Sequence, residues 1–203
     1  MANVALIGAS GNAGARILKE LSDRGHSVTA IARNPEKIAD LPKVTARRGD
    51  VDDKEGLAAL LRGHDAVISS VRFSASDPRV LIDAVRASGV RRYLVVGGAA
   101  SLEIAPGKRL LDQPDFPQAY KVEATKGAEF LDLLKGVQDL DWTFLSPSAM
   151  FMPGERTGKF RLGTDQLLTG EHGSSISFED YAVALVDELE KPAHVRRRFT
   201  VGY

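Results

Sequence analysis

Residues 4–14, with the sequence VALIGASGNAG, decide the fold of this chain. Residues 4–7 are apolar and favour a short buried strand, and residues 12–24 have the apolar spacing of an amphipathic helix. Between strand and helix the glycines have the spacing G-x-x-G-x-x-G, which lets the backbone turn sharply and approach a ligand. The first turn of the helix would offer free N–H groups and a partial positive charge to an anion. The stretch therefore predicts a phosphate-binding turn.

The residues that end this turn distinguish two kinds of phosphate site. A P-loop ends in Gly-Lys-Ser or Gly-Lys-Thr, whereas this turn ends in Ala13-Gly14-Ala15. A strand before the turn and a helix after it are typical of dinucleotide-binding proteins, so we expect the diphosphate of a nicotinamide dinucleotide at residues 8–14. Ser10 and Asn12 would add side-chain donors. A glycine-rich turn without a ligand is the alternative.

The rest of the chain alternates short apolar strands with longer helices. This pattern predicts an α/β fold, a doubly wound parallel sheet (Rossmann-like) with a small C-terminal substrate region. We expect one NAD(P)-binding domain over residues 1–203, a long loop at 102–117, and a lid that binds substrate at 147–175. The further expected strands are 27–33, 43–47, 65–70, 92–96, 142–145 and 198–201, and the further expected helices are 52–62, 78–88, 118–135 and 178–191.

Composition excludes several classes of protein. The chain has 203 residues, equal numbers of basic and acidic residues, and no cysteine, which rules out disulfides and thiol chemistry. A net charge of zero gives no field that would draw the chain to nucleic acid or an anionic membrane. We interpret the basic clusters Arg47-Arg48 and Arg196–Arg198 as solvated strand edges. With no signal peptide and no apolar run of membrane-spanning length, a cytoplasmic protein is expected.

Ligands bind beyond the carboxyl ends of the strands in such sheets, and several segments stand there. Arg33-Asn34 occupies the place where NAD binders carry Asp or Glu, and an arginine can bind a 2′-phosphate, so NADP(H) is favoured over NAD(H). A solvated arginine is the alternative.

Asp50 could accept a hydrogen bond from the adenine amino group while Val51 packs on the adenine ring. Alternatively, Asp50 or Asp52 could cap the next helix. The predicted cofactor-binding residues are Gly8, Ser10, Gly11, Asn12, Ala13, Gly14, Arg33, Asn34, Asp50, Val51, Ser69, Ser70, Val71, Gly98, Pro147 and Ser148.

Stretches spread over the whole chain carry a family resemblance. They are residues 5–11 (ALIGASG), 31–35 (IARNP), 49–51 (GDV), 95–102 (VVGGAASL), 140–144 (LDWTF) and 152–158 (MPGERTG). With them the chain resembles the atypical short-chain dehydrogenase/reductases. It is most similar to the NmrA-like NAD(P)H-binding group of proposed NADH-flavin reductases, which are relatives of biliverdin reductase B. The resemblance implies a doubly wound domain with a small C-terminal substrate region.

One family motif is missing. Catalytic short-chain dehydrogenases use a Tyr-x-x-x-Lys pair, in which the lysine lowers the tyrosine pKa for proton exchange with a carbonyl oxygen. Here Tyr120 is followed four residues later by Ala124, and Lys121 and Lys126 have the wrong helical offsets. Hydride transfer to a flavin, a quinone or a similar acceptor is easier to reconcile with this sequence, because the protein need only hold the two reactants in contact.

Candidate catalytic and substrate residues follow the fifth and sixth strands. Ser101 could orient the acceptor or donate a hydrogen bond to it, and Tyr120 could close the pocket; a turn serine and a core tyrosine are the alternatives. Met150, Phe151 and Arg156 are the substrate candidates, Arg156 for an anionic substrate, with core packing and a solvated loop as alternatives. No histidine and carboxylate cluster has metal-ligand spacing, so no metal site is expected.

Three functions remain open. The first is an NADP(H)-dependent reductase that passes hydride to a flavin-like or quinone-like small molecule. The second is a redox sensor that binds NADP(H) without chemistry and changes its affinity for a partner protein. The third is an epimerase or dehydratase acting on a sugar nucleotide, which would need a lysine close to Tyr120.

Overall fold

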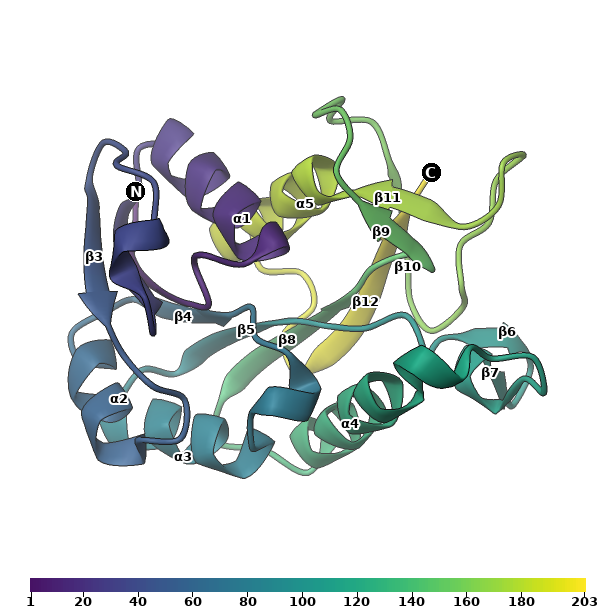
Figure 1. Ribbon diagram of the computed structural model, residues 1–203, viewed down its shortest axis with the longest axis horizontal. Coiled ribbons are helices and arrows are strands. Elements are labelled where there is room, and N and C mark those ends of the chain that lie inside the picture. The colour runs from purple at the N-terminus through teal and green to yellow at the C-terminus, as the bar shows by residue number, and fades with distance from the viewer.

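An eight-stranded sheet runs through the middle of the molecule (Figure 1). The computed structural model describes residues 1–203, and the strand order is β10-β12-β8-β5-β4-β1-β2-β3. Neighbouring strands are parallel except for β10, which pairs antiparallel with β12. The strands of this sheet are β1 (Asn3–Ile7), β2 (Ser27–Ala32), β3 (Val44–Arg48), β4 (Ala66–Ser69), β5 (Arg92–Val96), β8 (Asp141–Ser146), β10 (Arg161–Gly163) and β12 (Arg197–Gly202).

Helices cover both faces of the sheet, as the alternating sequence pattern predicts. Figure 1 shows α1 and α5 on one face and α2, α3 and α4 on the other. The helices are α1 (Asn12–Asp23), α2 (Lys54–Leu61), α3 (Pro78–Ser88), α4 (Gln118–Lys135) and α5 (Phe178–Glu190), with short 3-10 turns η1 (Pro35–Lys37), η2 (Phe73–Ala75) and η3 (Leu110–Asp112). This is a Rossmann-like fold, so the prediction of a doubly wound sheet is confirmed. No helix is both long and apolar enough to cross a membrane.

The core lies in two layers, one on each side of the sheet. Alternate residues of a strand point to opposite faces, and both faces of the central strands are buried. In β1, Val4 and Leu6 pack in the layer with α1 and α5, whereas Ala5 and Ile7 pack in the layer with α2, α3 and α4. This arrangement explains why the strand is apolar without interruption, and it holds the turn that follows β1 on a rigid base.

Local chemistry fixes the ends of the helices. Pro78 is the first residue of α3, and Gly89 ends that helix in the left-handed conformation with φ +81°. The cap of α2 differs from the expectation. Asp53 holds this position and accepts a hydrogen bond from the Gly56 nitrogen at 3.0 Å, so neither Asp50 nor Asp52 caps the helix.

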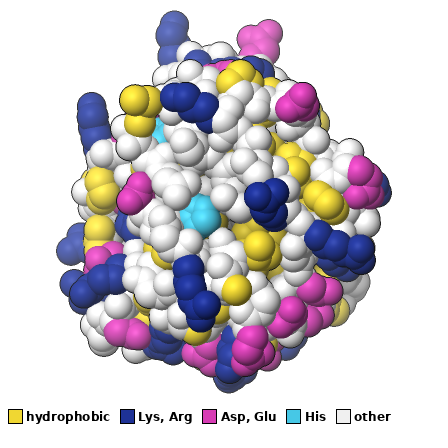
Figure 2. Space-filling model, turned by 90° about the vertical axis from the view of Figure 1, so that its left-hand side faces the viewer, with side chains coloured by type: hydrophobic (Ala, Val, Ile, Leu, Met, Phe, Trp, Pro, Cys, Tyr) yellow, Lys and Arg dark blue, Asp and Glu magenta, His cyan; other side chains and the backbone are white.

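The two basic clusters lie in different environments. Arg47 and Arg48 are exposed on the edge strand β3, which agrees with a solvated edge. Figure 2 shows this side of the molecule, where Lys and Arg are scattered with Asp and Glu between them. Arg198 lies on β12, between β10 and β8, and its side chain is buried against Asp165. The solvated-edge interpretation is therefore wrong for Arg198.

Two segments expected to be irregular contain strands. In the expected loop 102–117, β6 (Glu103–Ala105) and β7 (Lys108–Arg109) form a hairpin whose turn has Gly107 at φ +71°. In residues 147–175, β9 (Met150–Met152) pairs in parallel with β11 (Ser175–Ser177), and β10 extends the main sheet. Residues 161–163 therefore belong to the main sheet, and a substrate-binding lid at 147–175 stays a prediction.

Candidate functional site

A cavity of about 190 Å³ lies at the carboxyl ends of β1, β2 and β4, where this fold places ligands. We call it the cofactor cavity, because it brings together seven of the residues predicted to bind the cofactor. They are Gly8, Ser10, Gly11, Arg33, Val51, Ser70 and Val71. Sequence reasoning missed the others that line it, which are Ile7, Ile31, Ala32, Gly49, Arg72 and Ala75.

Two of the three glycines in the first turn are required by packing within the chain. Gly8 has φ +81°, and a Cβ at that position would overlap the carbonyl oxygen of Ser70. A Cβ on Gly14 would overlap the carbonyl oxygen of Gly8, whereas one on Gly11 would lie 3.4 Å from that same oxygen. Two of the glycines therefore hold the chain itself in a tight turn, in addition to leaving room for a ligand.

Backbone donors at the start of α1 have no partner in the chain. The nitrogens of Gly8 and Ala9 donate to the Ile31 carbonyl, but those of Asn12, Ala13 and Gly14 donate to no protein atom. No side chain caps this helix, and its first turn carries no acidic residue. Free amides and the positive end of the helix dipole make this turn a fitting cradle for a diphosphate.

Two arginines stand in the same cavity. Arg33 follows β2 and Arg72 follows β4, and both side chains are exposed without a hydrogen bond or ion pair within the chain. Unpaired guanidinium groups are suited to a phosphate, which they can bind with two parallel hydrogen bonds. Asp50 and Asn34 do not line this cavity. The Asp50 carboxylate accepts a hydrogen bond from the Asp52 nitrogen instead.

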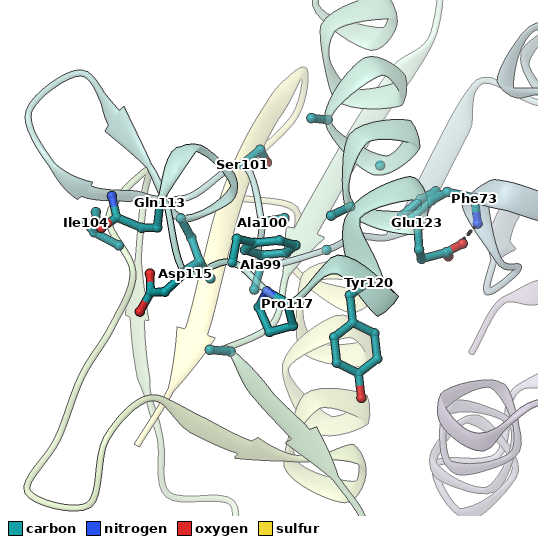
Figure 3. A pocket seen from close by; sticks show the side chains of 17 residues that line it. Phe73, Ala99, Ala100, Ser101, Ile104, Gln113, Asp115, Pro117, Tyr120 and Glu123 are labelled. Carbon is teal, nitrogen blue, oxygen red and sulfur yellow. Dashed lines mark hydrogen bonds between the residues drawn. The ribbon is translucent and has the colours of Figure 1, made fainter.

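A second, larger cavity of about 680 Å³ lies beyond the end of β5 (Figure 3). We call it the acceptor cavity, after the hydride acceptor that the sequence predicts. It lies between the end of β5, the β6–β7 hairpin with η3, and α4. Of its 17 lining residues 10 are hydrophobic. The lining includes the predicted residues Gly98, Ser101 and Tyr120. The complete lining is Phe73, Gly98, Ala99, Ala100, Ser101, Ile104, Leu110, Gln113, Asp115, Phe116, Pro117, Tyr120, Glu123, Ala124, Gly127, Ala128 and Ala149.

Ser101 is held by an arginine from a distant strand. The Arg198 guanidinium donates to the Ser101 Oγ at 3.1 Å and also binds Asp165, with Nη2 to Oδ1 at 2.6 Å. Because the serine oxygen accepts this hydrogen bond, its own proton remains free to point toward a ligand in the acceptor cavity. The sequence gives no sign of this contact, which joins residues 97 positions apart.

Tyr120 stands at the mouth of the acceptor cavity without a lysine. Its side chain is 66% exposed in the first turn of α4, and Figure 3 shows the hydroxyl directed away from Ser101. Ala124 lines the cavity at the position where the family motif has lysine, and no lysine is among the lining residues. Lys126 is bonded to Glu129 at 3.1 Å and lies outside this cavity.

Comparison with known proteins agrees with this geometry. A family model described as NAD(P)H-binding matches residues 8–192. The chain belongs to this NAD(P)H-binding family. The family resemblance expected from the sequence is thereby confirmed.

Three solved structures of similar chains have the same fold. A proposed exported protein from Burkholderia pseudomallei is 44% identical, with a TM-score of 0.90 and 100% of both chains covered. A proposed epimerase from Bacteroides thetaiotaomicron is 42% identical, with a TM-score of 0.94 over 99% of this chain and 96% of that one. A proposed NADH-flavin reductase from Streptococcus pneumoniae is 38% identical, with a TM-score of 0.83 over 100% and 99%. The cytoplasmic location of this family member remains a prediction.

Two serines predicted to contact the cofactor form hydrogen bonds within the chain. The Ser69 hydroxyl is buried and lies 2.9 Å from the hydroxyl of Tyr93, whose pKa is raised by burial. The Ser148 hydroxyl is buried and donates to the Val201 carbonyl at 3.0 Å. Both hydroxyls therefore already have a partner within the chain, and buried Pro147 lines neither cavity.

The structure does not bring the substrate candidates into the acceptor cavity. Phe151 packs on Phe178 and Tyr181 of α5, with ring centroids 4.5 and 4.7 Å apart, because β9 turns toward that helix. Met150 is half exposed outside the cavity, although its neighbour Ala149 lines the wall.

Arg156, expected to meet an anionic substrate, forms a two-point ion pair with Glu20 of α1, both contacts at 2.7 Å. Burial opposes ionisation of Glu20, but hydrogen bonds from Arg156 and Arg24 hold the pKa of its carboxyl below the usual value. Arg156 therefore has a structural partner and lines neither the cofactor nor the acceptor cavity.

Proposed function

We propose that this protein is an NADP(H)-dependent reductase that passes hydride to a flavin-like or quinone-like molecule in the acceptor cavity. The observation that carries the proposal is the pairing of two cavities along one edge of the sheet. One contains two unpaired arginines beside the free backbone amides of the α1 turn, and the other is large and mostly apolar. A dinucleotide site beside an apolar pocket is what hydride transfer to a flat organic acceptor requires.

The cofactor half of the proposal rests on charge. The first turn of α1 offers unpartnered N–H groups for the diphosphate, and Arg33 with Arg72 offers two cations for a further phosphate. Such a pair favours NADPH, which has a 2′-phosphate, over NADH. When bound, the coenzyme would supply a hydride from its nicotinamide ring.

The acceptor half rests on the one short segment that contributes lining residues to both cavities. Residues 71–75 border both, since Val71, Arg72 and Ala75 line the cofactor cavity while Phe73 lines the acceptor cavity. An acceptor there would be held against the coenzyme, which raises the effective concentration of the two reactants. Ser101 is the protein group placed to donate a hydrogen bond to the acceptor as it gains electrons.

Steady-state oxidation of NADPH tests this function. With riboflavin or a neutral naphthoquinone we expect acceptor-dependent loss of NADPH absorbance, one NADPH for each two-electron acceptor reduced. Assays without oxygen prevent re-oxidation of the product. No turnover with any such acceptor, despite tight NADPH binding, would contradict the reductase.

A redox sensor is the second candidate, favoured by the absence of a lysine from the cavity lining that includes Tyr120. A sensor would bind NADP+ and NADPH with clearly different affinities and would retain a partner protein with only one of them. Equal affinities, together with turnover, would exclude it. The sugar-nucleotide epimerase alternative loses support, because the lining of the acceptor cavity contains no lysine to pair with Tyr120.

A further inference from the structure

The acceptor cavity has negative side chains and no positive ones. Its charged lining residues are Asp115 and Glu123, and none of the 17 is Lys, Arg or His. Figure 3 shows the two carboxylates on opposite sides of the cavity. A bound anion would therefore meet like charge on either side, with no cation to compensate.

Neither carboxylate is neutralised by a basic side chain. Asp115 is exposed and forms no hydrogen bond or ion pair within the chain. Glu123 accepts from the backbone nitrogens of Phe73 at 2.7 Å and Ser74 at 2.8 Å. These donors are uncharged, so they satisfy the carboxylate oxygens and leave the net charge in place.

Two arginines near the cavity are already compensated by carboxylates. Arg198, which reaches Ser101, is paired with Asp165, and Arg109 of β7 is paired with Asp112 at 2.8 Å. The amino end of α4 also faces the cavity, but a helix dipole is worth about half a charge there, against two full negative charges. Its cap residue, Pro117, has no N–H to offer.

The neighbouring cofactor cavity has the opposite character, with Arg33 and Arg72 unpaired beside free amides. We propose that the acceptor cavity selects an uncharged acceptor without phosphate or sulfonate groups, and that Asp115 enforces this choice. The inference rests on the proposed reductase function and narrows its substrate class. The preferred flavin would be riboflavin, and not its phosphorylated form FMN. The preferred quinone would be neutral.

The test compares matched acceptors that differ by one anionic group. We expect kcat/KM to be at least about fivefold higher for riboflavin than for FMN at low salt, and likewise for a neutral over a sulfonated naphthoquinone. The difference should be mainly in KM. It should shrink as ionic strength rises, because exposed charges are screened.

Variants of one residue test the cause. Asp115→Asn should reduce the preference for the neutral acceptor, and Asp115→Lys should reverse it in favour of FMN. Glu171→Gln is the matched control, since this exposed carboxylate lines neither cavity and its loss should leave the preference unchanged. Equal kcat/KM for riboflavin and FMN, or a preference for FMN in the parent, would overturn the inference while leaving the reductase intact.

A binding measurement separates the two proposals. Quenching of flavin fluorescence by the NADP+-loaded protein reports affinity without turnover. No turnover with tighter binding of riboflavin than FMN would contradict the reductase but support the selectivity. Equal or tighter binding of FMN would overturn the selectivity whatever the rates.

Discussion

The carboxylate of Glu123 lies 2.7 Å from the backbone nitrogen of Phe73 and thereby connects α4 to the segment between the two cavities. Phe73 is buried at this point, and its ring lies against Gly127 of α4, where a Cβ would press on it at 2.8 Å. The position of residues 71–75, which border both cavities, is therefore set from α4. A change at Glu123 should be felt by both ligands.

Glu123→Ala should raise KM for NADPH and for the acceptor together, because two backbone donors lose their acceptor. We expect a stability loss of about 1–3 kcal/mol, measured by urea unfolding. Glu123→Gln keeps one acceptor oxygen and should recover part of both effects. Glu129→Ala is the control on the same helix, since Glu129 is exposed and bonded only to Lys126. Unchanged KM values in Glu123→Ala would contradict the connection.

Arg33→Ala should weaken NADPH binding by about tenfold to a hundredfold and leave NADH binding nearly unchanged, because only NADPH has the phosphate that the guanidinium would bind. Calorimetric titration of parent and variant with both coenzymes measures this difference. Arg47→Ala, on the exposed edge of β3, controls for a general loss of positive charge. If the parent binds both coenzymes equally well, Arg33 has no such role.

Gly8 and Gly89 form a natural pair for a test of the turn, since both have φ +81° but different surroundings. A Cβ on Gly89 would meet nothing within 4 Å, whereas a Cβ on Gly8 would overlap the Ser70 carbonyl. Gly89→Ala should cost about 1 kcal/mol from backbone strain alone. Gly8→Ala should cost at least about 2 kcal/mol more, because it adds a steric clash, and should abolish NADPH binding. Similar urea midpoints for the two variants would show that the overlap relaxes.

These residues also show how far sequence reasoning reaches. The sequence predicts the glycine turn, Arg33, Val51 and Ser70 because each lies close to the end of a strand, and the carboxyl ends of parallel strands share one edge. Arg72 was missed although it directly follows the predicted Val71.

The residues predicted after β8 line neither cavity, because long-range pairing decides the course of the chain there. Pairing of β9 with β11 directs Phe151 toward α5, and Arg156 meets Glu20, which lies 136 positions earlier. No local pattern reports such contacts. The same applies to Arg198. Its place in a run of three arginines favours a surface position, but a contact with a distant residue determines its burial.

Ser101 and Arg198 should act as one unit in turnover. Ser101→Ala should lower kcat by about tenfold or more, as expected when a hydrogen-bond donor to the reacting molecule is lost. Arg198 is a positioning residue, so Arg198→Ala should lower kcat less, with Arg198→Lys recovering part. The double variant should be no slower than Ser101→Ala, because the arginine acts through the serine. Additive losses in kcat would contradict this, and unchanged NADPH affinity would show that each variant is folded.

Glu188 of α5 should make stability fall in acid. It is buried, with Arg92 at 3.0 Å and His194 at 2.8 Å, and it also accepts from the Ala193 and His194 nitrogens. Burial opposes its ionisation, but the hydrogen bonds from His194 and Ala193 and the charge of Arg92 hold its pKa below 4.5.

A carboxyl group whose pKa is lowered by folding stabilises the protein above its unfolded pKa, and this contribution is lost as pH falls through the folded value. The parent should therefore lose stability as pH falls from about 5 toward 3. Glu188→Gln should be less stable than the parent by about 1–3 kcal/mol at pH 7, and its stability should fall less steeply in acid. Urea unfolding at several pH values measures both slopes. Glu171→Gln, an exposed carboxylate, should follow the parent, and parallel slopes for Glu188→Gln and the parent would show that another group controls the acid response.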